Sequence, residues 1–258
     1  MFHLLNHEFD NPKEGVEKAS DLLAGGIAQK GHQCGMLWGS ALAVGAESFR
    51  RYSNQSEAIA SAITASQYLV GSFVKRTKSV NCRDITGVDW KNKLDLTIYM
   101  VKIIMQGFIY SPCFNLIVKW TPEAIQAANK GLSEKTIQSR PGMSCATEVL
   151  KKMGASDEEA VIVAGFAGGI GLSGNACGAL SALIWYKMLD WGKKHPGKKP
   201  SFFNNQDIQR ILKAFNIQTN SEMLCNKICG IQFKSIDEHA EYLKSGGCGK
   251  LIDSLAEL

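Results

Sequence analysis

Residues 24–37 read AGGIAQKGHQCGML, and residues 167–180 read AGGIGLSGNACGAL. Eight of these fourteen positions are identical, at an offset of 143 residues. The same offset carries Cys82 onto Cys225, in the segments NCRDITG and LCNKICG. One register therefore holds without a gap from the first of these segments to the second. This pattern predicts an internal duplication in which both copies have kept their cysteines.

Helix signals fill both copies. Asn11, Pro12 and Glu14 provide an N-cap, a first-turn proline and a first-turn acid. The helix that they start is expected to end at Leu23. Residues 56–77 repeat apolar side chains at helical spacing, whereas few stretches of the chain alternate with a period of two. We therefore expect a mainly α-helical fold with little or no sheet.

A boundary between the copies is expected near the middle of the chain. A helix that starts at Thr121 should end before Gly131, and the turn-rich residues 131–141 follow it. The two copies should then form two similar lobes, at residues 1–131 and 142–258, related by a pseudo-two-fold axis.

The cysteines recur at the starts of predicted helices, just after a glycine or serine. Those in this position are Cys34, Cys145, Cys177 and Cys248. Free backbone N–H groups and the helix dipole favour a thiolate over a thiol at such a place. The thiolate is the form that binds iron or zinc and the form that carries out redox chemistry.

Composition and charge favour a soluble cytoplasmic protein. The chain has 258 residues, of which 45% are apolar, and a net charge of +5. Its lysines cluster in WGKKHPGKKP at residues 191–200, where the turn formers predict a solvated loop rather than a nucleic-acid surface. The first residues, MFHLLNHEFD, do not form a signal peptide. No nucleic-acid partner is expected.

The most apolar stretch, residues 96–118, contains Lys102, Pro112 and Asn115. It is expected to be a buried helix with its exit turn, so no membrane insertion is predicted. Because the cytosol keeps thiols reduced, the eight cysteines point to metal or redox chemistry rather than to structural disulfides.

The halves differ in their cysteine sets. The second half holds Cys145, Cys177, Cys225, Cys229 and Cys248, and the first half holds Cys34, Cys82 and Cys113. By the offset, Phe2 stands in place of Cys145 and Thr86 in place of Cys229. Four dispersed thiolates suit an iron–sulfur cluster or a structural zinc. The chain has no CxxC motif, and without CxxCH no covalent haem is expected.

We expect Cys145, Cys177, Cys225 and Cys248 to converge on one metal cluster, with Cys229 adjacent as a spare ligand or exchange partner. The three cysteines of the first half should also come together. They would leave one iron open to water, substrate or His32, which lies two residues before Cys34. In the alternative, the first half is a degenerate copy that only supports the fold.

At these residues the chain resembles the C-GCAxxG-C-C family of redox-active proteins. The family pattern is an early cysteine, a glycine-rich loop ending in CGAxxG, a CxxLxG segment and a late cysteine. The second half matches all four parts, with Cys145, GNACGALSA, CNKICG and Cys248. The first half matches three, with CGMLWG, CRDITG and Cys113. Ala182 departs from the last glycine of the loop, which Gly39 keeps in the first half.

The resemblance implies a helical fold and a function in electron transfer or redox sensing, with a partner protein that exchanges electrons. A related domain in split-Soret cytochrome c accompanies an iron–sulfur cluster, so a 2Fe-2S or 4Fe-4S cluster is the implied cofactor. Two alternatives stay open: a thiol–disulfide oxidoreductase that uses Cys225 and Cys229, and a zinc-stabilised interaction module. A homo-oligomer is compatible with each of them.

Overall fold

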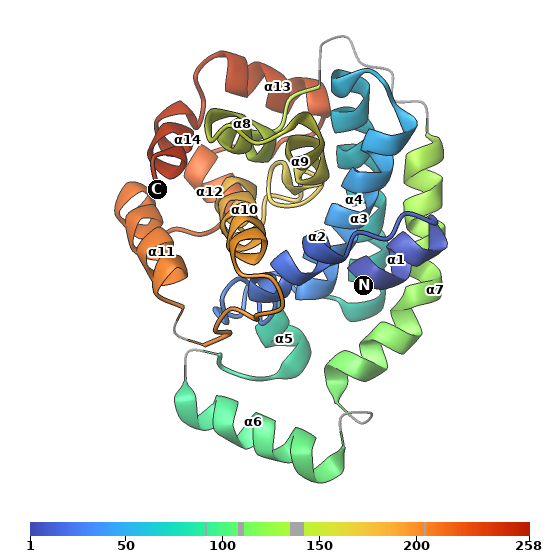
Figure 1. The fold of residues 1–258 in the computed structure, drawn as a ribbon, viewed down its shortest axis with the longest axis vertical. Helices are drawn as coiled ribbons and strands as arrows, with labels where there is room; N and C mark the ends of the chain where they lie inside the picture. Colours follow the sequence, from blue (N-terminus) through green and yellow to red (C-terminus); the bar gives the residue numbers. More distant parts are fainter. Residues whose placement is uncertain (91, 108–110, 135–141, 204) are drawn as a thin grey trace.

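The computed structural model of the chain is helical throughout its described part. The described residues are 1–90, 92–107, 111–134, 142–203 and 205–258. They contain fourteen α-helices, two short 3-10 helices and no strand, apart from two isolated β-bridges. The mainly α-helical fold expected from the sequence is confirmed (Figure 1).

The first half supplies seven α-helices and one 3-10 helix. They are α1 (Phe2–Glu8), α2 (Glu14–Ala19), η1 (Asp21–Leu23), α3 (Gly35–Arg51), α4 (Gln55–Thr77), α5 (Cys82–Thr86), α6 (Lys93–Gln106) and α7 (Pro112–Ser133).

The second half repeats this order with a shorter end. Its helices are α8 (Cys145–Lys152), α9 (Asp157–Ile162), η3 (Ala164–Phe166), α10 (Gly178–Lys194), α11 (Gln206–Thr219), α12 (Cys225–Cys229), α13 (Ile236–Lys244) and α14 (Gly249–Ala256). The capping box predicted from Ser156 and Glu159 is present at the start of α9.

The duplication is visible in the backbone. Helices α1, α2, α3 and α5 begin 143 residues before α8, α9, α10 and α12. The loop ahead of each long helix is tied down in the same way. The N–H of Cys34 donates to the Val80 carbonyl at 2.8 Å, and the N–H of Cys177 donates to the Met223 carbonyl at 2.9 Å. Both copies therefore use one scaffold to place the cysteine that precedes the long helix.

The two halves interlock through an exchange of short helices. Helix α2 of the first half packs on α10 of the second, and α9 of the second half packs on α3 of the first. The indole N–H of Trp185 on α10 donates to the Val16 carbonyl on α2 at 3.2 Å. The rings of Trp38 and Phe166 meet edge to face across the other contact, with centroids 4.7 Å apart. One apolar core consequently contains residues from both halves.

Close backbone approach makes this packing tight. Gly45 on α3 faces the carbonyl of Ile162 on α9, and a Cβ at position 45 would overlap that carbonyl. The two helices can pack at this distance because residue 45 has no side chain.

Two helix boundaries differ from the sequence-based predictions. The helix expected from Asn11 to Leu23 is divided at Ser20 into α2 and the 3-10 helix η1. The helix expected to start at Thr121 is the second part of α7, which contains Pro122 internally and continues past Gly131. Residues 135–141 of the expected boundary stretch lie outside the described residues.

The prediction of a buried helix within residues 96–118 was wrong. Helix α6 lies at one end of the molecule (Figure 1), and several of its apolar side chains face outward. Met105 is 81% exposed and Ile104 is 68% exposed. Along the described chain, no helix combines the length and the apolar character needed to cross a membrane.

Candidate cysteine sites

The five cysteines of the second half come from four separate segments. Cys145 is the first residue of α8, and Cys177 is the N-cap of α10. Cys225 and Cys229 stand at the two ends of α12, and Cys248 is the N-cap of α14. Folding brings these segments together, although up to 103 residues separate Cys145 from Cys248 along the chain.

Cys229 lies at the centre of this group. Its Sγ is 3.5 Å from the Sγ of Cys248 and 3.8 Å from the Sγ of Cys225. Cys145 and Cys177 lie within electrostatic reach of these sulfurs. The sequence assigned Cys229 a subsidiary place, whereas the structure puts it between two other thiols.

Tyr242 on α13 borders the same sulfurs. Its hydroxyl hydrogen-bonds to the sulfurs of Cys229 and Cys248. The ring lies against Gly247, where a Cβ would overlap it. The glycine next to Cys248 therefore lets the phenol ring lie over the start of α14.

Hydrogen bonds make Cys229 the most acidic thiol of the group. The thiols of Cys225 and Cys248 and the hydroxyl of Tyr242 donate to its sulfur, and they hold the pKa of Cys229 far below its ordinary value. The same hydrogen bonds, together with burial, raise the pKa of Cys225 and of Cys248. The group therefore contains one thiolate flanked by two protonated thiols.

The expectation that the helix-start cysteines are thiolates was wrong for the chain by itself. Burial raises the pKa of Cys34 and of Cys145 to about 12 and that of Cys177 to about 11. Backbone hydrogen bonds at the helix starts do lower the pKa of these thiols, but burial has the larger effect. These three thiols are protonated at neutral pH.

A smaller site of the same kind lies in the first half. Cys34 is the N-cap of α3, Cys82 begins α5, and Cys113 lies in the first turn of α7. Each of the three is within electrostatic reach of the other two. Tyr99 on α6 approaches them, with its hydroxyl 3.5 Å from the Sγ of Cys113.

The two tyrosines occupy equivalent positions, because Tyr99 and Tyr242 are 143 residues apart. Each hydrogen-bonds to the late cysteine of its half, Cys113 or Cys248. This common neighbour makes Cys113 the counterpart of Cys248, although the two do not obey the offset. Helix α6 is longer than α13, and this accounts for part of the difference.

Two histidines lie close to these sites without joining the sulfurs in a printed contact. His239 on α13 is buried, its Nδ1 lies 3.4 Å from the carbonyl oxygen of Met143, and burial lowers its pKa to about 4. It is therefore neutral at pH 7. The side chain of His32 lines a cavity together with Lys30 and Arg83.

The described cysteines do not form a ready-made mononuclear metal site. Across the described ranges, no group of three or more Cys, His, Asp or Glu residues is arranged to hold a metal ion. All eight cysteines are free of disulfide bonds. The gathered side chains thus form two thiol sites, one with five cysteines and one with three.

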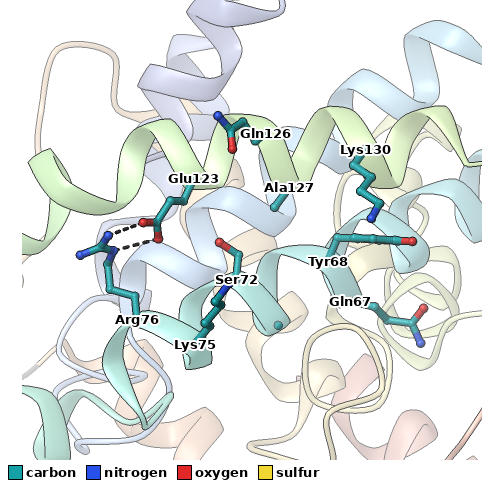
Figure 2. Close-up of a pocket in the computed structure, with 10 residues that line it drawn as sticks. Gln67, Tyr68, Ser72, Lys75, Arg76, Glu123, Gln126, Ala127 and Lys130 are labelled. Carbon is teal, nitrogen blue, oxygen red and sulfur yellow. Dashed lines mark hydrogen bonds and ion pairs between the residues drawn. The ribbon is translucent and has the colours of Figure 1, made fainter.

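A cavity of about 830 Å³ lies elsewhere, between α4 and α7. Figure 2 shows that its charged side chains already have partners. Arg76 is paired with Glu123, and the ammonium group of Lys130 lies 5.2 Å from the centre of the Tyr68 ring. No cysteine lines this cavity, so it is not part of either thiol site.

Comparisons with known proteins agree with the arrangement in two copies. The model of the family described as "Putative redox-active protein (C_GCAxxG_C_C)" matches residues 1–118 and again residues 143–258. Neither a search of curated proteins nor a search of solved structures found a match. Because the two matched segments cover most of the sequence, the chain belongs to the C_GCAxxG_C_C family of redox-active proteins, which it contains as two tandem copies.

Proposed function

We propose that the protein transfers electrons or senses redox state through an iron–sulfur cluster held in the second half. Cys145, Cys177, Cys225 and Cys248 would be its ligands, with Cys229 as an additional thiolate. The observation that carries this proposal is the gathering of five cysteines from four segments around one point.

The donor set suits such a cluster chemically. Iron–sulfur clusters are held by cysteine thiolates, and this group offers five sulfurs from buried or half-buried residues. The raised pKa of Cys145 and Cys177 means that these thiols must lose protons when metal binds, and the charge of the metal favours that loss. The Tyr242 hydroxyl supplies a hydrogen bond to sulfur, which is one way in which proteins set a cluster's reduction potential.

A second candidate function is thiol–disulfide exchange, and the state of Cys229 favours it. A thiolate at Cys229 would attack a disulfide of a partner protein and form a mixed disulfide, releasing one partner thiolate. Cys248, whose Sγ is 3.5 Å away, would lose its proton to that thiolate and attack the Cys229 sulfur. The partner leaves with both thiols reduced, and the two electrons come from a new Cys229–Cys248 disulfide.

Anaerobic purification followed by iron, zinc, acid-labile sulfide and free-thiol analysis separates the candidates. Iron with sulfide, lost in Cys177→Ser, supports the cluster. Free thiols without metal, together with reduction of a disulfide substrate that Cys229→Ser abolishes, support exchange. Zinc without sulfide would contradict both candidates and would support a zinc-stabilised interaction module.

A further inference from the structure

A cavity of about 790 Å³ lies between the two halves, close to both thiol sites. Its first-half wall comes from the loop ahead of Cys34 and from the start of α5. Its second-half wall comes from α11 and from the segment ahead of α12. A volume of this size is typical of small-molecule binding sites, which span roughly 300–1,000 Å³.

Positive charge dominates the lining. Lys30, Arg83 and Lys213 all line the cavity, and within the described chain none of them forms an ion pair with an acid. Charged groups on one wall of a cleft concentrate anions there.

The acid in the lining is already occupied. The Glu222 carboxylate accepts the N–H groups of Met223 at 2.8 Å and Leu224 at 2.9 Å. Lys227 lies 3.6 Å from it, and these contacts keep its pKa below the ordinary value. Glu222 therefore does not neutralise the basic groups on the opposite wall.

The duplication shows that this charge is not a requirement of the fold. The counterparts of Lys30, His32 and Arg83 in the second half are Ser173, Asn175 and Asn226. The backbone is nevertheless matched, because the N–H of Arg83 donates to Gly31 and the N–H of Asn226 donates to Gly174. One scaffold thus carries neutral side chains in one copy and basic side chains in the copy that faces the cavity.

We propose that this cavity binds a small-molecule dianion, bearing a phosphate group or two carboxylates. Arg83 presents a planar fork that matches either group, and Lys30 and Lys213 add positive charge. Leu212 and Met223 give the cavity an apolar part that suits the carbon portion of an organic ligand. The proposal is independent of what the thiol sites hold.

The position of the cavity gives such a ligand access to both sites. Asn81 is the N-cap of α5, which begins at Cys82. Leu224 is the N-cap of α12, which begins at Cys225. Since both N-caps line the cavity, a bound dianion would lie between the thiol site of the first half and that of the second.

Isothermal titration calorimetry of the full chain as purified tests the proposal, with inorganic phosphate and succinate as the two probes. We expect saturable binding of at least one probe to a single site, weakened about tenfold or more in Arg83→Gln/Lys213→Gln. Acetate, a monoanion of related chemistry, should bind at least about tenfold more weakly than succinate if succinate is the better probe. The probe that binds more tightly identifies the phosphate or the carboxylate class.

The matched control is Lys234→Gln, since Lys234 is exposed and does not line the cavity. It should leave the affinity unchanged. Thermal unfolding of each variant checks that the fold is retained, which is expected because Arg83 and Lys213 are both exposed. Absence of saturable binding, or binding that the double substitution leaves intact, would overturn the proposal. Either result would leave the metal analysis of the thiol sites unaffected.

Discussion

At the scale of single residues, Tyr242 is the group whose role can be isolated most cleanly. Tyr242→Phe removes one hydroxyl that hydrogen-bonds to the Cys229 sulfur and leaves the ring in place. A hydrogen bond to a charged group contributes about 1.5–3 kcal/mol, so the pKa of Cys229 should rise by about one unit. The measurement is the pH dependence of Cys229 alkylation by iodoacetamide in reduced, metal-free protein, read by mass spectrometry.

The sign of the effect follows from the direction of the pKa change. A higher pKa leaves less thiolate at mildly acidic pH, so the alkylation profile of Tyr242→Phe should shift towards higher pH. Tyr186→Phe is the control, because Tyr186 is a half-buried tyrosine on α10 with no contact to these sulfurs. An unshifted profile in Tyr242→Phe would show that the hydroxyl does not stabilise the thiolate.

The residue scale also shows where sequence reasoning stops. The repeated cysteines and glycines could be found because they recur within dense matches, such as residues 24–37. Tyr99 and Tyr242 obey the same offset but are surrounded by differences, so their pairing had no weight before folding placed each beside a cysteine. The protonation of Cys177 depends on burial, and a sequence pattern does not report burial.

At the scale of helices, the crossing of α3 and α9 depends on Gly45. Gly45→Ala would place a methyl group on the Ile162 carbonyl and force the two helices apart. Overpacking of this kind costs roughly 1–3 kcal/mol in the free energy of unfolding, measurable by urea titration. Gly71→Ala on α4 is the matched control, because no atom lies within 4 Å of its added Cβ. It should be neutral or stabilising, by up to about 1 kcal/mol.

A buried carboxylate on α3 makes the stability of the protein depend on pH. Burial raises the pKa of Glu47, but hydrogen bonds and charge from Arg50 and Arg51 lower it further, to below its ordinary value of 4.5. A folded-state pKa below the unfolded one stabilises the fold above pH 4.5, and this contribution is lost as the pH falls through the folded pKa.

Glu47→Gln should therefore reduce the free energy of unfolding at pH 7 by about 2 kcal/mol, and by much less near pH ~3. Urea titrations at the two pH values measure the difference, with Glu257→Gln at the exposed C-terminal end as control. An equal loss at both pH values would assign the effect to packing rather than to charge.

The helices that the sequence misjudged are those without a full counterpart in the other half. Helix α7 has 22 residues, whereas α14 has 8, so the duplication gave no template for its length. Helix α6 has the apolar content of a buried helix, but no described segment covers its outer face. Apolar periodicity identifies a helix and leaves open whether another segment will cover it.

At the scale of the whole molecule, the exchange of α2 and α9 should make the halves depend on each other. Trp185 and Phe166 of the second half both complete their contacts with first-half residues. Residues 142–258 expressed alone should therefore lack a cooperative thermal transition and near-ultraviolet circular dichroism. Addition of residues 1–131 should restore both signals. A cooperative transition in the isolated second half would contradict this prediction and would make each half a domain in its own right.

The two thiol sites share a scaffold but differ in the chemistry that they can support. Phe2 and Thr86 stand where the second half has Cys145 and Cys229, so the first half offers three sulfurs and no flanked thiolate of the Cys229 kind. We therefore expect Cys177→Ser to remove all bound iron from anaerobically purified protein and Cys34→Ser to remove none. Iron and sulfide analysis of the two variants, with thermal unfolding to show that both are folded, makes the comparison. Loss of iron from Cys34→Ser would mean that the three-cysteine site also binds metal, with a coordination position left for a ligand other than cysteine.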